Sequence, residues 1–128
     1  DNEVYEDGIL VSTQNRTETC QYYAFFTGVA TMEDYPKLWE RLVKDFGPDR
    51  AEKGAYPEIY SSNAFIGNFL RLELLCKNEY YAQLLEEIKG YFLYMANLTG
   101  TLWEFIDTFA SCNHGFASYV ACLIQKAE

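Results

Sequence analysis

Ser62-Asn-Ala-Phe-Ile-Gly-Asn-Phe-Leu-Arg-Leu-Glu-Leu-Leu-Cys76 is the stretch that decides the predicted fold. Its apolar residues lie around most of the circumference of a helix: Phe65, Ile66, Phe69, Leu70, Leu72, Leu74 and Leu75. A helix that is apolar nearly all round must be buried on nearly all sides. Residues 17 to 29 and 115 to 125 have the same character, so we predict three buried helices.

Two other segments have a different pattern. Residues 33 to 46 and 79 to 97 place apolar side chains at the i, i+3, i+4, i+7 rhythm and charged side chains on the opposite face, which is typical of amphipathic helices. Buried and amphipathic helices therefore alternate along the chain. A four-helix bundle would need amphipathic helices throughout, whereas two helical layers require this alternation. We predict an all-α fold of αα-hairpins with alternating inner and outer helices, and residues 1–128 as a single helical domain or fragment.

Two segments outside these helices carry turn signals. Residues 1 to 16 place apolar residues around Glu6-Asp7-Gly8, which predicts a short N-terminal β-ribbon with a glycine-containing turn. Residues 47 to 60 contain two prolines and two glycines and are predicted to form a long loop, with Ser61 or Ser62 as the N-cap of the next helix. Loops of this length in compact domains tend to be functional.

Composition limits the partners and the location. The chain has 128 residues, of which 49% are hydrophobic, and a formal net charge of −9. It is long enough for one domain with a sizeable core, and its acidity argues against nucleic acid and anionic membranes as partners. No transmembrane helix or signal peptide is predicted, and the missing initial Met indicates a processed or excised chain. Its localisation is left open between periplasmic, secreted and cytoplasmic. One histidine and scattered cysteines predict no metal site, and no cofactor is predicted.

Three loops are candidates for a shared site. If the buried helices begin at one end of the fold, residues 13 to 18, 56 to 63 and 99 to 114 lie along one rim. Amide and carboxylate groups bind the hydroxyls of a sugar while aromatic rings cover its apolar face, so polar and aromatic residues in these loops predict a carbohydrate site. The candidates are Glu18, Glu58, Tyr60, Trp103, Glu104, Asn113 and His114.

Each main candidate also has a structural explanation. Glu104 could form a capping box with Thr101. Glu18 could be a first-turn carboxylate that complements a helix dipole. Trp103 could belong to the core, and His114 could belong to a turn before Gly115.

Several motifs resemble a known family. Thr17 to Phe26, Tyr56 to Phe65, Gly100-Thr-Leu-Trp-Glu104 and Asn113-His-Gly115 resemble the C-terminal half of the catalytic domain of bacterial α-L-rhamnosidases. These enzymes belong to glycoside hydrolase family 78 and have an (α/α)6 toroid. The resemblance extends from about residue 12 to residue 126, and the Thr-Leu-Trp-Glu and Asn-His-Gly motifs are its most specific part.

This resemblance implies inverting hydrolysis of terminal α-L-rhamnosides. In such a mechanism a general acid protonates the leaving oxygen and a general base activates water, with the two carboxyl groups about 6.5–9.5 Å apart. The resemblance places Glu104 at the base position, Trp103 beside it, and His114 at the position of a sugar-hydroxyl contact. The family's general acid lies in a segment that has no counterpart in this chain.

The missing acid leads to three further expectations. The isolated chain should be inactive, the remainder of the parent catalytic domain should be a partner, and exposed inner helices should self-associate. Two alternatives remain open. One is a non-catalytic helical domain that binds carbohydrate or a protein, and the other is another (α/α)6 glycosidase such as a glucosidase or uronyl hydrolase.

Overall fold

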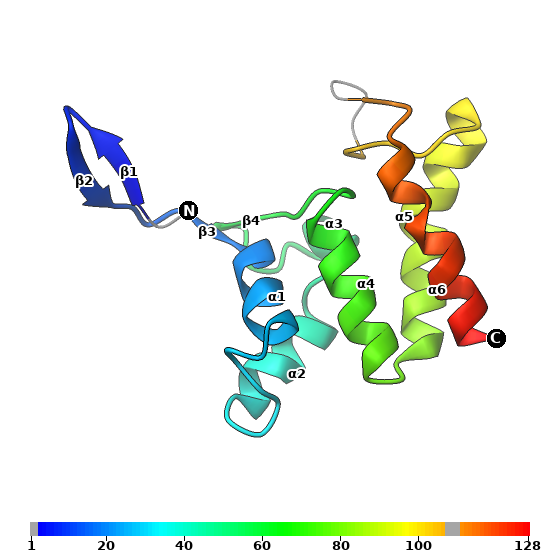
Figure 1. The fold of residues 1–128 in the computed structure, drawn as a ribbon, viewed down its shortest axis with the longest axis horizontal. Helices are drawn as coiled ribbons and strands as arrows, with labels where there is room; N and C mark the ends of the chain where they lie inside the picture. Colours follow the sequence, from blue (N-terminus) through cyan, green and yellow to red (C-terminus); the bar gives the residue numbers. More distant parts are fainter. Residues whose placement is uncertain (1–2, 107–110) are drawn as a thin grey trace.

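The computed structural model describes residues 3–106 and 111–128. The elements in chain order are β1 (Glu3–Glu6), β2 (Ile9–Ser12), β3 (Arg16–Thr17), α1 (Glu18–Phe26), α2 (Pro36–Lys44), α3 (Arg50–Lys53), β4 (Ile59–Tyr60), α4 (Gly67–Lys77), α5 (Tyr81–Thr99), the 3-10 helix η1 (Gly115–Tyr119) and α6 (Val120–Ala127). Helix α4 packs against α1, α5 and α6 (Figure 1). It is therefore the centre of the fold.

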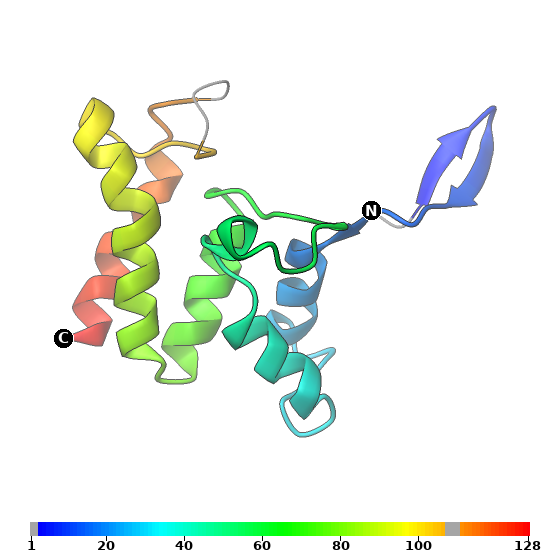
Figure 2. The ribbon, with the colours of Figure 1, turned by 180° about the vertical axis from the view of Figure 1, so that it is seen from behind.

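The helices lie on two sides of the core. In Figure 1 α1, α4 and α6 face the viewer, and Figure 2 shows α2 and α5 on the opposite side. The largest fully buried side chains come from both sides: Trp103, Tyr22, Leu70, Leu75, Leu84, Met95 and Leu123. The apolar periodicity that predicted helices over residues 33–46, 62–76 and 79–97 is confirmed, with shorter helices than the first two ranges.

Helix α4 has a larger share of buried residues than α1 and α6, the other two helices that the sequence predicts to be buried on nearly all sides. Eight of the eleven residues of α4 are buried, as the sequence predicts. Helix α1 instead exposes Tyr23 and Phe26, and α6 buries only Val120 and Leu123. The prediction for α1 and α6 is wrong: each leaves one side exposed, whereas α4 packs against α1, α5 and α6.

The predicted fold class is also wrong: the chain is neither all-α nor a fragment of an (α/α)6 toroid. About 53% of the described residues are helical and about 10% are in strands, with two small sheets beside six α-helices. One sheet is a parallel pair, in which Arg16 of β3 lies opposite Ile59 of β4. Helical periodicity reports only on the helices, so it gave no information about these extended segments between them.

The predicted N-terminal ribbon is confirmed. Strands β1 and β2 pair antiparallel, with Val4 opposite Val11. Asp7 and Gly8 form the turn with φ of 50° and 80°, the positive values that a two-residue hairpin turn needs to match the twist of its strands. The ribbon projects away from the helices (Figure 1), and Tyr5 and Ile9 on it are largely exposed.

The N-cap of α4 differs from the prediction. The helix begins at Gly67, and neither Ser61 nor Ser62 caps it. The side-chain oxygen of Asn63 instead accepts hydrogen bonds from the backbone N–H groups of Ile66 and Gly67. None of the helices in the described ranges is long and apolar enough to cross a membrane.

Candidate functional site

The three loops named above lie next to one another at the start of α1, α4 and η1. The β3–β4 pairing joins residues 13–18 to residues 56–63, with Thr17 opposite Tyr60. The backbone N–H of Ala64 donates to the carbonyl oxygen of Glu104 at 2.9 Å, which joins the second loop to the third. We call the described residues 13–18, 56–64, 99–106 and 111–114 the rim.

Glu104 is held in the rim by its main chain. Its N–H donates to the carbonyl of Ser111 at 2.9 Å, and its own carbonyl accepts from Ala64. The side chain is half-buried, and none of the described residues forms a hydrogen bond or ion pair with its carboxylate. No helix forms over residues 101–104, so Glu104 is not part of a capping box. The backbone is thus fixed while the carboxylate stays available.

His114 is joined to the segment that carries Glu104 by a second main-chain hydrogen bond. Its N–H donates to the carbonyl of Leu102 at 2.8 Å. The imidazole is half-buried and meets the ring of Phe65 edge-on, with ring centroids 4.7 Å apart. Asn113, the preceding residue, is exposed. The imidazole of His114 therefore lies against an aromatic ring that directly follows the loop 56–64.

The structure places Trp103 in the core. Its side chain is fully buried, and the indole N–H donates to the hydroxyl of Thr99 at 2.7 Å. Its ring contacts Tyr94 at a centroid distance of 5.8 Å. The indole therefore has no face open for a sugar in this structure, and it fixes the segment that carries Glu104.

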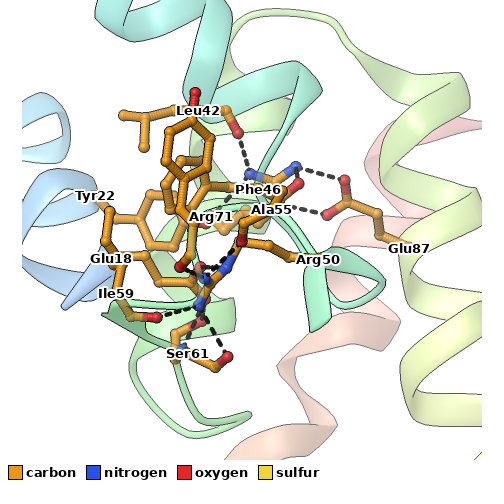
Figure 3. A network of polar contacts seen from close by, with 12 residues as sticks. Glu18, Tyr22, Leu42, Phe46, Arg50, Ala55, Ile59, Ser61, Arg71 and Glu87 are labelled. Carbon is orange, nitrogen blue, oxygen red and sulfur yellow. Dashed lines mark hydrogen bonds and ion pairs between the residues drawn. The ribbon is translucent and has the colours of Figure 1, made fainter. Parts of the chain in front are cut away.

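Glu18 is buried, with 3% of its surface exposed. One carboxylate oxygen accepts from Arg50 Nε at 3.0 Å (Figure 3). The other accepts from the N–H and hydroxyl of Ser62 at 2.7 and 2.6 Å. As the first residue of α1, Glu18 also occupies the first-turn position that favours a carboxylate. Its oxygens join α1 to two loops.

Arg50 is the partner that sequence reasoning missed. Its guanidinium donates to the carbonyls of Ala55, Tyr56 and Ile59 and to the hydroxyl of Ser61 (Figure 3). These bonds hold the loop from Ala55 to Ser61 around one cation. Nothing in the loop composition marks Arg50 as buried, because an arginine among turn residues normally lies in water.

A second buried arginine was also missed, although the sequence marks it. Arg71 lies within the apolar stretch of α4, where a buried charge requires a partner. Its guanidinium donates to both oxygens of Glu87 at 2.6 and 2.7 Å and to the carbonyls of Leu42, Val43 and Phe46. It thereby caps the C-terminal end of α2. Burial raises the pKa of Tyr22, whose hydroxyl accepts from Arg71.

The remaining predicted site residues lie at the open side of the rim. Glu58 is exposed, and Tyr60 has 61% of its surface exposed. A cavity of about 470 Å³ lies between the α2–α3 segment and α5, where Phe46, Gln83 and Tyr91 contribute to its wall. None of the predicted site residues lines this cavity. Glu58, Tyr60, Glu104, Asn113 and His114 lie outside this cavity, with exposed or half-buried side chains that a ligand could meet.

Comparison with known proteins adds no assignment. No protein-family model, no curated protein and no solved structure matches the chain. The assignment of function therefore depends on the residues of the rim and on the resemblance of its motifs.

Proposed function

We propose that the rim forms part of the active site of a glycoside hydrolase that acts on terminal α-L-rhamnosides, with Glu104 as the general base. The observation that carries this proposal is the state of Glu104: its backbone is bonded on both sides, and its carboxylate is unpaired among the described residues. A base must be held in place and still be free to accept a proton. The resemblance of Thr101-Leu-Trp-Glu104 and Asn113-His-Gly115 supplies the substrate class.

In the proposed reaction Glu104 takes a proton from water as the water oxygen attacks the anomeric carbon. The bond from that carbon to the leaving oxygen breaks, and a carboxylic acid about 6.5–9.5 Å from the base protonates the leaving oxygen. Glu18 is unsuited to the role of acid, because Arg50 and Ser62 engage both of its oxygens. The resemblance assigns the acid to a segment outside this chain, so the 128 residues alone should lack activity.

The neighbours of Glu104 divide into two roles. His114 and Asn113 offer hydrogen-bond donors and acceptors to sugar hydroxyls, and Phe65 limits the rotation of the imidazole by edge-on contact. Trp103 acts as a positioning residue, since its buried indole anchors the residue next to the base. This division keeps four of the predicted residues in one mechanism.

The test is Glu104→Gln in the full-length protein that carries this chain. The variant preserves the shape of the side chain and removes its basicity, so kcat for an aryl α-L-rhamnoside should fall by about 10²- to 10⁴-fold. The melting temperature should not change. Proton NMR of the early product should show inversion at the anomeric carbon. Azide should partly restore the turnover of Glu104→Ala, because it replaces the activated water.

Glu79→Gln is the matched control, because Glu79 is exposed and lies beyond the opposite end of α4. It should leave kcat and the melting temperature unchanged. A near-normal kcat in Glu104→Gln, with the protein still folded, would refute the proposal. A lowered melting temperature without azide rescue would assign Glu104 a structural role.

A second candidate function is carbohydrate binding without catalysis. The open surface of the rim favours it, since exposed Tyr60 and Asn113 suit a shallow sugar contact. Two measurements on the same protein separate the two functions: hydrolysis followed by NMR and sugar binding followed by calorimetry. Binding of L-rhamnose to the full-length protein without hydrolysis of any aryl glycoside would favour this second function.

A further inference from the structure

Two segments of the rim, residues 101–104 and 111–114, run beside each other with an irregular pairing. The two main-chain hydrogen bonds described above join them. Between the bonded residues the first segment has only Trp103, whereas the second has both Cys112 and Asn113. The second segment therefore holds one extra residue, as in a β-bulge. Such a residue interrupts regular pairing and redirects the side chains next to it.

Side-chain hydrogen bonds make a further connection between these two segments. The indole N–H of Trp103 donates to the hydroxyl of Thr99 at 2.7 Å. The hydroxyl oxygens of Thr99 and Thr101 are 2.8 Å apart. The hydroxyl of Thr101 donates to the carbonyl oxygen of Cys112. A row of polar groups therefore runs from the buried indole to the main chain immediately before Asn113.

The number of protons decides the direction of these hydrogen bonds. A threonine hydroxyl has one proton to donate and two lone pairs that accept. Because Thr101 donates its proton to Cys112, the proton between the two hydroxyls must come from Thr99. The carbonyl of Met95, the other acceptor near the Thr99 hydroxyl, is more distant at 3.2 Å. Each group thus donates to the next, and hydrogen bonds arranged in this way polarise and strengthen one another.

Thr101 is the member of this row that joins one segment to the other. Its hydroxyl contacts Thr99, which holds the indole of Trp103, the residue next to Glu104. The same hydroxyl holds the carbonyl of Cys112. Thr101 is half-buried and belongs to no helix or strand, so no secondary structure requires its hydroxyl. Removal of this hydroxyl would break the connection between the indole and the loop while every helix stays in place.

We propose that Thr101 is a positioning residue, whose hydroxyl sets the distance between the base Glu104 and the sugar contacts Asn113 and His114. This inference rests on the proposed function of the rim. Groups that act together in a site must be held within about 0.5 Å of their productive arrangement. The main-chain bonds bring the segments together, and the bond to the carbonyl of Cys112 fixes the orientation of the peptide that leads into Asn113.

The first experiment is Thr101→Val in the full-length protein that carries this chain. Valine keeps the shape of the side chain and removes the hydroxyl. We expect kcat for an aryl α-L-rhamnoside to fall about 10- to 100-fold, because a displacement of about 1 Å within a site has an effect of this size. The melting temperature should stay close to that of the wild type. Thr101→Ser keeps the hydroxyl and should restore most of the wild-type kcat.

Thr27→Val is the matched control. The hydroxyl of Thr27 also donates to a main-chain carbonyl, that of Tyr23, at 2.8 Å. Thr27 follows the last residue of α1, whereas the rim lies at the start of this helix. The control therefore removes a comparable hydrogen bond at a distance from the proposed site, and it should leave kcat unchanged.

Hydrogen exchange on the 128-residue chain tests the connection without any substrate. In Thr101→Val the indole N–H of Trp103 and the backbone N–H of His114 should exchange faster than in the wild type, because both belong to segments that the hydroxyl joins. The amides of α2 should not change. In Thr27→Val both protons should exchange at the wild-type rate.

The outcomes separate this proposal from the proposed hydrolase function. Unchanged exchange at Trp103 and His114 in Thr101→Val would overturn the positioning role. So would a near-normal kcat in Thr101→Val when Glu104→Gln is inactive, and the hydrolase function would then still stand. Equal losses in Thr101→Val and Thr101→Ser would show that the hydroxyl is not the cause. A near-normal kcat in Glu104→Gln would refute the hydrolase function, and exchange would still decide whether Thr101 joins the two segments.

Discussion

The hydroxyl of Tyr119 is buried in the described part of the molecule without a hydrogen-bond partner. The ring lies among aromatic neighbours, with Phe69 at a centroid distance of 4.9 Å and Phe92 at 6.3 Å. Burial raises the pKa of this phenol above its ordinary value of 10.0, and the nearby Glu73 adds to the effect. A buried polar atom without a hydrogen-bond partner lowers the free energy of unfolding, so a residue without this hydroxyl would suit the position better.

Tyr119→Phe should leave the stability at pH 7 unchanged or raise it by up to about 1 kcal/mol, because it removes only the unpartnered hydroxyl. Above pH 10 the unfolded wild-type chain releases the phenolic proton while the folded chain keeps it. The free energy of unfolding then falls by about 1.4 kcal/mol per pH unit for this group. Urea titrations between pH 7 and pH 11.5 should therefore show a shallower alkaline loss in Tyr119→Phe.

The control is Tyr23→Phe, which removes the hydroxyl of a tyrosine with 44% exposure. It should retain the alkaline dependence of the wild type. Parallel stability curves for Tyr119→Phe and the wild type above pH 10 would contradict the assignment.

At the scale of single residues, individual side chains could be identified from the sequence, but the residues with which they form ion pairs could not. Arg71 lies in an otherwise apolar helix, so the sequence indicates that it needs an anionic partner. The sequence does not indicate that this partner is Glu87. Glu18 and Arg50 are 32 residues apart in sequence, and the fold of the loop between α2 and α4 brings them together. Local patterns cannot report such pairs, because the two members are brought together by packing elsewhere.

At the scale of elements, the start of α4 leaves no room for a side chain at position 67. A Cβ on Gly67 would lie 2.0 Å from Cβ of Ser62 and 2.9 Å from its Cα. Ser62 is itself held by Glu18, so it cannot easily move away. The close approach therefore requires a glycine at position 67.

Gly67→Ala should lower the free energy of unfolding by about 1–3 kcal/mol, because the loop must shift to admit a methyl group. The matched control is Gly90→Ala in the middle of α5, where an added Cβ meets nothing within 4 Å. This second change should raise stability by up to about 1 kcal/mol, since alanine favours helix more than glycine does. Urea unfolding midpoints measure both. A shift in the same direction for the two variants would show that crowding at Gly67 is not the cause.

Most helices could be predicted because their apolar spacing is a local property. The predicted helix over residues 79–97 agrees closely with the observed helix α5 over residues 81–99. The apolar pattern placed the start of α2 at residue 33, whereas the helix begins at Pro36. The pair β3–β4 could not be predicted, because two-residue strands have no periodicity. Ile59, which pairs with Arg16, lies in the loop that Arg50 holds, so this pairing involves contacts that are distant in sequence.

At the scale of the whole molecule, two buried arginines join segments that are distant in sequence. Arg50 connects α1, the α3 loop and the lead into α4, and Arg71 connects α4, α2 and α5 (Figure 3). The two small sheets, one of them beside this polar framework, make the fold differ from the predicted all-α arrangement. The proximity of the three rim loops could be predicted from the direction of the helices. The polar framework could not, because it depends on hydrogen bonds between residues that are distant in sequence.

Breaking the framework at one member should be costly. Glu18→Gln removes the anion that balances Arg50 and should lower the free energy of unfolding by about 3–5 kcal/mol. The control, Lys44→Met, removes an exposed partner of Glu40 and should produce no measurable change. Denaturant unfolding measures each.

A double variant separates pairing from packing. Glu18→Gln/Arg50→Met removes both charges, so it should cost less than the sum of the two single changes. Strict additivity would mean that the two side chains act independently. A stability of Glu18→Gln equal to that of the wild type would show that the buried pair is not needed for folding.

The β1–β2 ribbon has a practical consequence. Its turn at Asp7 and Gly8 lies away from the helices (Figure 1), and exposed loop tips of this kind accept insertions at little thermodynamic cost. A fluorophore or an affinity peptide inserted there should extend from the molecule without touching α4 or the rim. The ribbon is thus an attachment point for immobilising or labelling the protein while its polar framework stays intact.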